Sequence, residues 1–183
     1  MVFQNGGISM YLISAYFDNQ TTKQLQRYIN SIAEETGNVY MTENNVPPHM
    51  TISSFEIRKP EDLVNDFYRL KSLGKCHINI ISVGEFLPYV IYAAPVLNKG
   101  LQHLSESIYN YISVREDVLI SKCYQPFSWF PHITLGKKLD KEQMVQAFQS
   151  MQIHFTPIQG QIVSLGLAET NPHRDIARID LND

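Results

Sequence analysis

Two near-copies of one five-residue string hold the side chains of this chain that are best suited to chemistry. They span Pro48–Ile52 and Pro131–Leu135, and each reads proline, histidine, apolar residue, threonine, apolar residue. This alternation is typical of a half-buried β-strand, in which residues two positions apart project from the same face. Each string would therefore present one imidazole and one hydroxyl together. Two such strands facing each other would form a site with two histidines and two hydroxyls.

These side chains are His49 and Thr51 in the first string, and His132 and Thr134 in the second. The ordinary pKa of histidine is about 6.5, so a neutral imidazole can take a proton while a protonated one gives a proton. Threonine hydroxyls can donate hydrogen bonds to the non-bridging oxygens of a phosphate, and an imidazolium adds electrostatic stabilisation. This set can hold an anion and move protons without a metal, so we expect neither a metal site nor a cofactor.

The other histidines lack this matched context. His154 begins a third His-x-Thr string, but no proline precedes it, and we interpret it as structural. His77, His103 and His173 have no counterpart at the matching place in the other half of the chain. We therefore expect these three histidines to be structural or surface residues.

The similarity of the two halves extends beyond the strings. Residues 63–67 and 144–148 share an apolar-Val-x-x-Phe pattern, and both lie in segments with helical spacing. Further along the chain, Ile-Ser-Val-Gly at 81–84 is echoed by Val-Ser-Leu-Gly at 163–166. Matched strings in matched places indicate a duplicated unit with a long period.

Each half reads as strand, helix, motif strand, helix and strand. Periodicity predicts helices over 22–35, 61–73, 101–113 and 141–151, and further strands over 9–17, 90–96 and 176–181. We predict an α+β fold that forms one domain over residues 1–183. This domain would be bilobal and duplicated, with repeats of approximately 8–89 and 90–181. Two antiparallel β-sheets would line a central groove, and helices would pack on the outside.

Composition and charge narrow the function classes. The chain has 183 residues and a net charge of −3, which argues against a long sequence-independent contact with duplex nucleic acid. Its two cysteines do not have the spacing of a disulfide framework or a zinc site. The N-terminal residues lack a signal-peptide pattern, and prolines and a glutamate interrupt the most apolar stretch, 78–97. We expect a cytoplasmic protein that does not enter a membrane.

The paired strings, one in each half of the chain, resemble those of the 2H phosphoesterase superfamily, most closely its 2′–5′ RNA ligase and RNA 2′,3′-cyclic phosphodiesterase branch. The resemblance covers nearly the whole chain in pattern. It implies a bilobal α+β fold and metal-independent cleavage, or in some members formation, of 2′,3′-cyclic or 2′–5′ phosphodiester linkages. His49 and His132 would be the acid–base pair, and Thr51 and Thr134 would hold the phosphate. Which histidine is the acid depends on the orientation of the substrate.

Further substrate-binding residues are predicted around the strings. Tyr124 and Trp129 lie just before the second string, where aromatic rings can stack on a base, although packing against the sheet is an alternative for such rings. Lys137 follows the second string and can attract an anion. Tyr16, late in the predicted 9–17 strand, is a further candidate.

We expect the partner to be an RNA end, an oligonucleotide or a cyclic nucleotide, bound by a monomer that needs no protein partner. Hydrolysis of a 2′,3′-cyclic phosphate or a 2′–5′ linkage by the two histidines is the main functional prediction, with 2′–5′ ligation as the reverse reaction. Two alternatives remain open. One is a non-catalytic module that binds nucleotides or RNA ends, and the other is a 2H enzyme that acts on a small-molecule cyclic phosphodiester.

Overall fold

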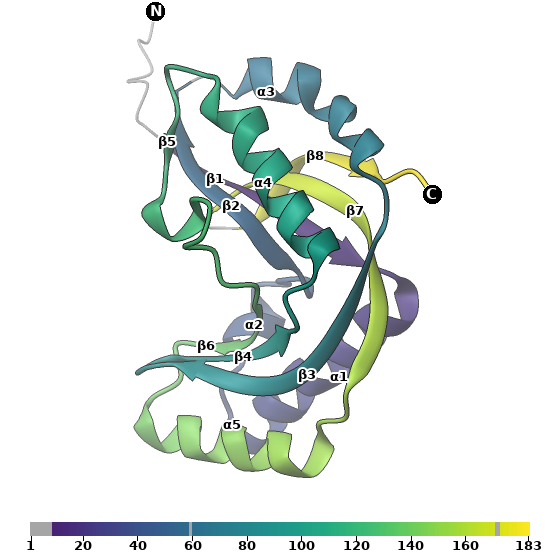
Figure 1. The fold of residues 1–183 in the computed structure, drawn as a ribbon. Helices are drawn as coiled ribbons and strands as arrows, with labels where there is room; N and C mark the ends of the chain where they lie inside the picture. Colours follow the sequence, from purple (N-terminus) through teal and green to yellow (C-terminus); the bar gives the residue numbers. More distant parts are fainter. Residues whose placement is uncertain (1–8, 59, 171–172) are drawn as a thin grey trace, which may run out of the picture.

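The computed structural model describes residues 9–58, 60–170 and 173–183, and Figure 1 shows how their helices and strands are arranged. The strands are β1 (Ser9–Phe17), β2 (Met50–Ile57), β3 (Cys76–Phe86), β4 (Val90–Pro95), β5 (Leu119–Ile120), β6 (Ile133–Lys137), β7 (Ile158–Glu169) and β8 (Arg174–Asp180). The helices are α1 (Asn19–Thr36), α2 (Tyr40–Glu43), α3 (Glu61–Asp66), α4 (Lys99–Ser113) and α5 (Lys141–His154), with 3-10 segments η1 (Phe67–Leu73) and η2 (Lys122–Tyr124). Helices combined with an antiparallel sheet confirm the predicted α+β class.

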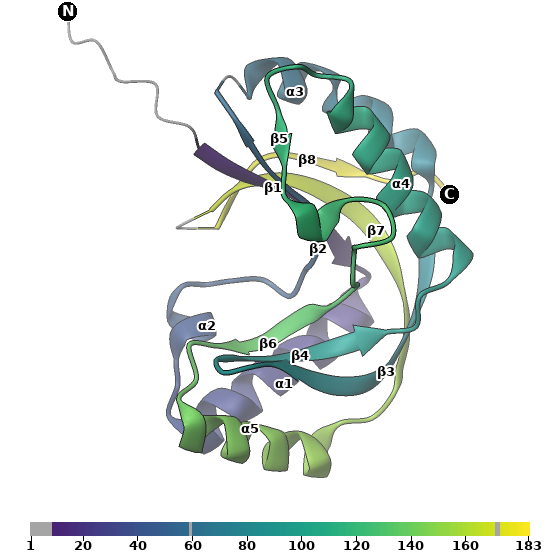
Figure 2. The same ribbon diagram turned by 60° about the vertical axis from the view of Figure 1, so that its left-hand side comes forward.

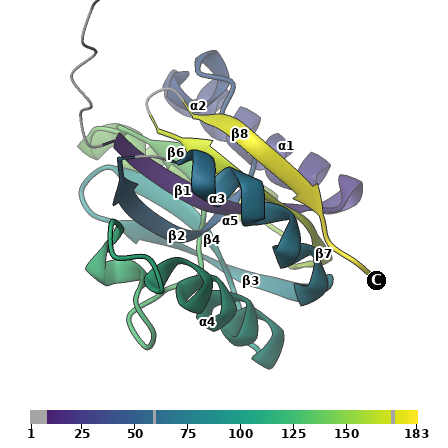
Figure 3. The same ribbon diagram turned by 90° about the horizontal axis from the view of Figure 1, so that it is seen from above.

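The described strands join into one curved antiparallel sheet rather than two separate sheets. Its pairs run from β1 to β2, β6, β4, β3 and β7, and β7 pairs again with β1, which closes the circuit. The two expected sheets are joined at the Met50–Ile133 pair of β2 and β6 and through the long strand β7. Its residues 158–162 pair with β3, and its residues 162–169 pair with β1. β5 is added beside β2, and β8 is added beside β7 at an edge of the sheet (Figure 3).

When β5 and β8 are left aside, the pattern of pairs among the other six strands is unchanged on exchange of the two halves of the chain. If β1, β2 and β3 are replaced by β4, β6 and β7, the β1–β2 pair becomes β4–β6, and the β1–β7 pair becomes β4–β3. The β2–β6 and β3–β7 pairs map onto themselves. This pattern supports the predicted duplication.

The helices interleave the two halves on the outside of the sheet. α1, from the first half, packs against β6 and α5, whereas α4, from the second half, packs against β2 and η1. Figure 2 shows α1 and α5 together below the β3–β4–β6 part of the sheet, and α3 and α4 together at the opposite end of the molecule. Each half therefore contributes to both ends of the fold.

Local sequence explains where the long helices begin and which face they bury. The Asp18 and Asn98 side chains each accept a hydrogen bond from the backbone N–H three residues on, which caps α1 and α4. Asp140 and Gln143 form a reciprocal capping box at the start of α5. The predicted apolar stripe of α1 is buried, and it consists of Leu25, Tyr28, Ile29 and Ile32.

The predicted helix over 61–73 differs from the observed one. It is an α-helix only to Asp66 and continues as the tighter η1. The Leu63 carbonyl accepts a hydrogen bond from the Tyr111 hydroxyl at 2.9 Å, and the Phe67 N–H donates to Val64, three residues back. A tertiary contact thus occupies a carbonyl that an α-helix would use, and the next turn tightens.

Within the ranges that the structure describes, no helix is both long enough and apolar enough to cross a membrane.

Candidate active site

The two predicted strings meet where β2 and β6 pair. Met50, which begins β2, lies opposite Ile133, which begins β6, and both side chains are fully buried. The residues on either side of each project from the opposite face of the strand. These neighbours are the histidine and the threonine of each string, and all four are partly exposed. The structure therefore gathers the four predicted side chains on one face, around one residue pair.

β2 and β6 diverge beyond this pair. Among the described residues they share only the Met50–Ile133 pair. Away from it, Thr51 lies opposite Ser14 of β1, and Thr134 lies opposite Tyr92 of β4. The site thus lies at a junction between two strands, each held in place by its other neighbour in the sheet.

Both imidazoles are anchored to backbone in the same way. Nδ1 of His49 lies 2.8 Å from the Pro47 carbonyl oxygen, and Nδ1 of His132 lies 2.9 Å from the Phe130 carbonyl oxygen. Because a carbonyl oxygen only accepts, Nδ1 carries a proton in both rings. Nε2 is therefore the atom that gains or loses a proton in each histidine. A matched pair of oriented Nε2 atoms can serve as one base and one acid.

His49 lies in a crowded, partly buried environment. Its ring stacks on that of His173, with centroids 4.7 Å apart and planes 25° apart, and the Tyr16 ring is 6.4 Å away. Burial lowers the pKa of His49 to about 4, and the nearby His173, His132 and Lys137 add to this effect, while the Pro47 hydrogen bond opposes it. His49 is therefore neutral near pH 7, which is the state that a general base requires.

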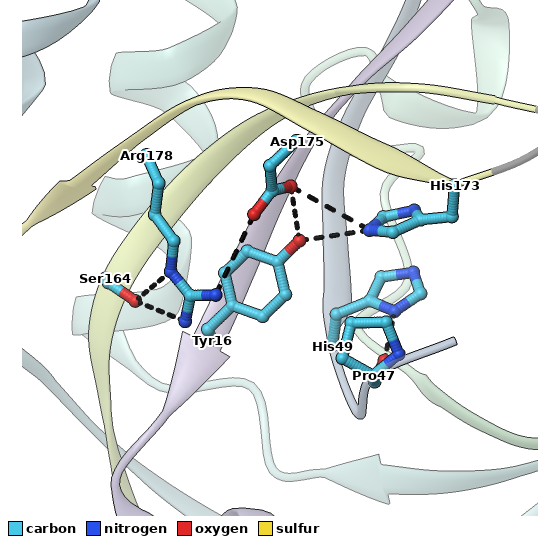
Figure 4. Close-up of polar contacts among 7 residues, drawn as sticks. All are labelled: Tyr16, Pro47, His49, Ser164, His173, Asp175 and Arg178. Atoms are coloured by element: carbon cyan, nitrogen blue, oxygen red, sulfur yellow. Dashed lines mark hydrogen bonds and ion pairs between the residues drawn. The ribbon is translucent and has the colours of Figure 1, made fainter. Parts of the chain in front are cut away.

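A chain of polar contacts continues from His173 to β8 (Figure 4). The Tyr16 hydroxyl donates to Asp175 Oδ1 at 2.6 Å and lies 3.0 Å from Nε2 of His173. The Arg178 guanidinium lies over the Tyr16 ring at 3.9 Å and is 3.8 Å from Asp175. It also donates two hydrogen bonds to the Ser164 hydroxyl, at 3.1 and 3.3 Å. Residues from β1, β7 and β8 thus form one connected network beside His49.

Glycines of the echoed strands make room for tyrosines near the two imidazoles. A Cβ atom at Gly166 would lie 2.6 Å from Asp175 Oδ1 and 2.7 Å from Cε2 of Tyr16. A Cβ atom at Gly84, which ends the matching string of the first half, would lie 2.6 Å from the Tyr92 hydroxyl oxygen. The Tyr16–Asp175 contact therefore depends on a residue without a side chain at position 166.

His132 has aromatic rather than polar neighbours. The rings of Phe86 and Tyr92 lie edge-on to it at 4.9 and 5.7 Å, and the Phe130 ring lies at 6.3 Å. Burial lowers the pKa of His132, and the hydrogen bond to Phe130 opposes this shift. Phe86 and Phe130 are substantially exposed, so apolar ring surface is available beside this imidazole.

The further predicted substrate-binding residues differ in how far they are buried. The Trp129 indole N–H donates to the Thr51 carbonyl at 3.0 Å, and its ring packs on the core, so it supports β2. Tyr124 is partly buried, and its pKa is raised by burial, although a hydrogen bond with the Thr51 side chain opposes this. Lys137 is exposed at the end of β6 and acts electrostatically on His49.

Sequence reasoning missed His173, Asp175 and Arg178. We expected His173 to be a structural or surface residue, but it lies against His49 and bonds Tyr16. One signal was present, because Pro172-His173 repeats the Pro-His pair that begins both strings. No threonine follows, so the string match failed. The contact arises because β8 pairs with β7 next to β1, which the pattern of a single strand does not reveal.

Comparisons with known proteins match this chain through its fold. No protein-family model matches it, and no curated protein does either. A crystal structure of a phosphoesterase matches with a TM-score of 0.65 and 14% identity, over 97% of this chain and 100% of the other. E. coli LigT in its apo form matches with a TM-score of 0.64 and 12% identity, over 96% of this chain and 99% of the other.

A third solved structure, the Thermus thermophilus protein TT0787, matches with a TM-score of 0.55 and 14% identity, over 94% of this chain and 97% of the other. Near-complete coverage in both directions means that the whole arrangement of helices and strands is shared. Identities this low establish the fold and leave the reaction to be argued from the site. The chain has the fold of the phosphoesterase and LigT structures, as its resemblance to the 2H phosphoesterases predicts.

Proposed function

We propose that this protein is a metal-independent phosphodiesterase of the 2H type that opens 2′,3′-cyclic phosphates, or cleaves 2′–5′ linkages, at RNA ends or in oligonucleotides. One observation carries the proposal. His49 and His132 lie on either side of the Met50–Ile133 pair, and each is anchored through Nδ1 so that Nε2 is free for proton transfer. The substrate phosphate would bind between the two imidazoles, and Thr51 and Thr134 would donate to its non-bridging oxygens.

In the proposed hydrolysis, water attacks the phosphorus of the cyclic phosphate. One imidazole Nε2 takes a proton from that water as the new P–O bond forms. The bond from phosphorus to one ribose oxygen breaks, and the other imidazole, protonated at Nε2, gives its proton to that oxygen. Breaking the bond to O3′ yields a 2′-phosphate and a 3′-hydroxyl. If a ribose 5′-hydroxyl attacks the cyclic phosphate in place of water, the same displacement of O3′ forms a 2′–5′ linkage, and this step is the reverse of 2′–5′ cleavage to a cyclic phosphate.

The two different environments support a division of roles. His49 is neutral near pH 7 because burial lowers its pKa to about 4, so we assign it the base role. His132 is assigned the acid role, since a bound phosphate anion favours the charged form of an imidazole beside it. The imidazolium would also stabilise charge that builds on the phosphate oxygens in the transition state.

The comparisons support nucleotide chemistry as the substrate class. E. coli LigT, which shares the fold, has been solved in complexes with ATP, 3′-AMP, NADP+ and phosphate. In this chain, the exposed rings of Phe86 and Phe130 lie beside His132, where a base could stack. Lys137 would attract the anionic substrate.

The test is turnover of a 2′,3′-cyclic-phosphate-ended oligonucleotide in the presence of EDTA, read by product mass and by 31P NMR. His49→Ala and His132→Ala should each lose about 10²- to 10⁴-fold in turnover, the range typical of a positioned acid or base. His103→Ala is the matched control, because His103 is exposed on α4, outside the site. Turnover that survives both site substitutions would remove the proposed mechanism.

A small-molecule substrate is the second candidate. The net charge of −3 gives no broad basic surface for a long nucleic acid. The same assay should therefore include 2′,3′-cyclic mononucleotides and ADP-ribose 1″,2″-cyclic phosphate. A preference for these substrates would favour an enzyme that acts on a small-molecule cyclic phosphodiester. Binding of the tested compounds without any turnover would favour a non-catalytic binding module.

A further inference from the structure

We propose that His173 is a positioning residue that holds the His49 imidazole in place for proton transfer, and that Tyr16, Asp175 and Arg178 in turn hold His173. The inference rests on the proposed function for its catalytic meaning, and on the observed contacts for its physical basis. It concerns side chains from β1 and the β7–β8 region, none of which belongs to the two Pro-His-x-Thr strings.

The first step of the argument is how His49 is held. The Nδ1 bond to Pro47 fixes one edge of the ring but leaves rotation about that contact. The stack with His173, at 4.7 Å and 25°, covers one face of the ring and restricts that rotation. A proton-transfer atom has to be placed to within a fraction of an ångström, since a displacement of about 1 Å can cost about 100-fold in rate. The His173 ring therefore helps to fix the direction in which His49 Nε2 points.

The second step is how His173 is held. Burial raises the pKa of Tyr16 well above its ordinary range, so its hydroxyl keeps its single proton. The hydroxyl uses this proton to donate a hydrogen bond to the carboxylate of Asp175 at 2.6 Å. The Tyr16 oxygen then accepts from Nε2–H of His173 at 3.0 Å, which fixes the tautomer of His173. Figure 4 shows the ring of His173 lying over that of His49 while its Nε2 points to Tyr16 and Asp175.

The third step is the anchor of the network in the fold. Arg178 lies 3.9 Å from the Tyr16 ring centroid, 3.8 Å from Asp175, and donates two hydrogen bonds to Ser164. Ser164 lies opposite Tyr16 in the β1–β7 register and is almost fully buried. The contacts therefore run without a break from a buried serine of the central strand to the ring on which His49 rests.

The fourth step is that this network of side chains supports only one of the two imidazoles, that of His49. β8 lies outside the duplicated order of elements, and the described residues contain no equivalent strand beside β3. His132 instead contacts the rings of Phe86, Tyr92 and Phe130. The site is thus asymmetric, with a hydrogen-bonded network behind one histidine and an aromatic cluster around the other. An asymmetric support suits two imidazoles with different tasks.

The charges around His49 agree with this role. The rings of His173, just before β8, and Tyr16 of β1 lie against it, and His132, just before β6, and Lys137 of β6 act on it electrostatically. Asp175 and Arg178 of β8 contact Tyr16. Two stacked imidazoles cannot both be protonated without strong repulsion. Burial lowers the pKa of His173, and Asp175, 3.9 Å from His173 Nε2, opposes this shift. Burial, together with the neighbouring His173, His132 and Lys137, lowers the pKa of His49, so His49 is uncharged near pH 7 and able to accept a proton.

The test compares His173→Ala, His173→Phe and Tyr16→Phe with wild type, and with His103→Phe as the matched control on exposed surface. Phenylalanine at 173 keeps a stacked ring but removes the nitrogens, whereas alanine removes the ring. The first readout is the titration of His49 followed by 15N NMR on histidine-labelled protein, with the His49→Gln spectrum for assignment. The second is the pH profile of kcat and KM, and circular dichroism checks that each variant is folded.

In His173→Ala, His49 should titrate at higher pH, because its ring gains water and loses a neighbouring imidazole. kcat should fall by about 10- to 100-fold with little change in KM, as expected for lost orientation of a catalytic group. His173→Phe should recover part of kcat and show a smaller upward shift, and Tyr16→Phe should shift the His49 signals in the same direction. His103→Phe should match wild type in all readouts.

The two proposals fail in different ways. An unchanged His49 titration in the folded His173→Phe and Tyr16→Phe variants overturns the positioning inference, whatever the activity. A shifted titration in a protein that turns over no phosphodiester removes the proposed function and supports the positioning inference, because NMR reads the contact without any reaction. If His173→Ala does not fold, the other two variants carry the test.

Discussion

The hydroxyl of Tyr16 donates a 2.6 Å hydrogen bond to Asp175, which is 159 positions further along the chain. This contact connects β1, the first described strand, with β8, the last. It exists because β1 and β8 both pair with β7. It also requires that Gly166 of β7 has no Cβ atom, since such an atom would overlap both side chains.

Gly166→Ala should therefore disrupt the network beside His49. Its Cβ would lie 2.6 Å from Asp175 Oδ1 and 2.7 Å from Tyr16 Cε2, far inside van der Waals contact. Overpacking of this kind typically costs about 1–3 kcal/mol in the free energy of unfolding, which denaturant titration measures. Because part of the clash is with Asp175, the cost should be smaller in an Asp175→Ala background. Equal costs in both backgrounds would contradict the close approach of residues 166 and 175.

Stability should rise with pH between about 4 and 6.5, in part because of His49. Its pKa is lowered to about 4 in the folded protein, against an ordinary value of 6.5, so the unfolded chain binds the extra proton in this window. The contribution is present above about pH 6.5 and is lost as pH falls toward 4, and it amounts to up to about 3 kcal/mol. The lowered pKa of His132 adds in the same direction.

Urea unfolding at a series of pH values measures this dependence. His49→Gln should flatten the rise in unfolding free energy over that range, while His103→Gln should leave it as in wild type. A His49→Gln protein that loses stability on acidification as steeply as wild type would show that His49 does not titrate as described.

Thr51→Val and Thr134→Val should each reduce kcat/KM by about 10- to 100-fold, which is less than either histidine substitution. A hydrogen bond to a charged group contributes about 1.5–3 kcal/mol, and about 1.4 kcal/mol corresponds to tenfold in rate. Valine keeps the branched shape on the strand, so the fold should survive. Thr42→Val, on the short helix α2, is the matched control. Wild-type kinetics in both site variants would remove the phosphate-binding role of the threonines.

Trp129 should report on ligand binding through its fluorescence. It is the single tryptophan of the chain, and its indole N–H donates to the backbone carbonyl of Thr51 in the first string. A phosphate that binds to Thr51 should change the emission of that indole in the inactive His132→Ala protein titrated with 2′,3′-cyclic AMP. Binding detected by calorimetry without any change in emission would place the nucleotide away from this end of β2.

Much of the fold could be predicted because its signals are local. Alternation in the 9–17 segment predicted β1 with its observed bounds, and the apolar stripe from Leu25 to Ile32 predicted α1. Side-chain caps such as Asp18 act within one turn, so they too are readable from neighbouring residues. The predicted helix over 61–73 failed at Asp66 because the hydroxyl that takes the Leu63 carbonyl comes from Tyr111, far along the chain.

The candidate site also has a part that local sequence predicts and a part that depends on tertiary structure. The sequence by itself determined which side chains each motif strand presents, because strand alternation sets the face of His49 and Thr51, and of His132 and Thr134, without reference to the rest of the chain. Only the tertiary structure decided that Met50 and Ile133 pair, that His173 stacks on His49, and that the two imidazoles have unlike neighbours. Those relations depend on which strands lie side by side, and strand pairing joins residues whose separation along the chain leaves no periodic trace.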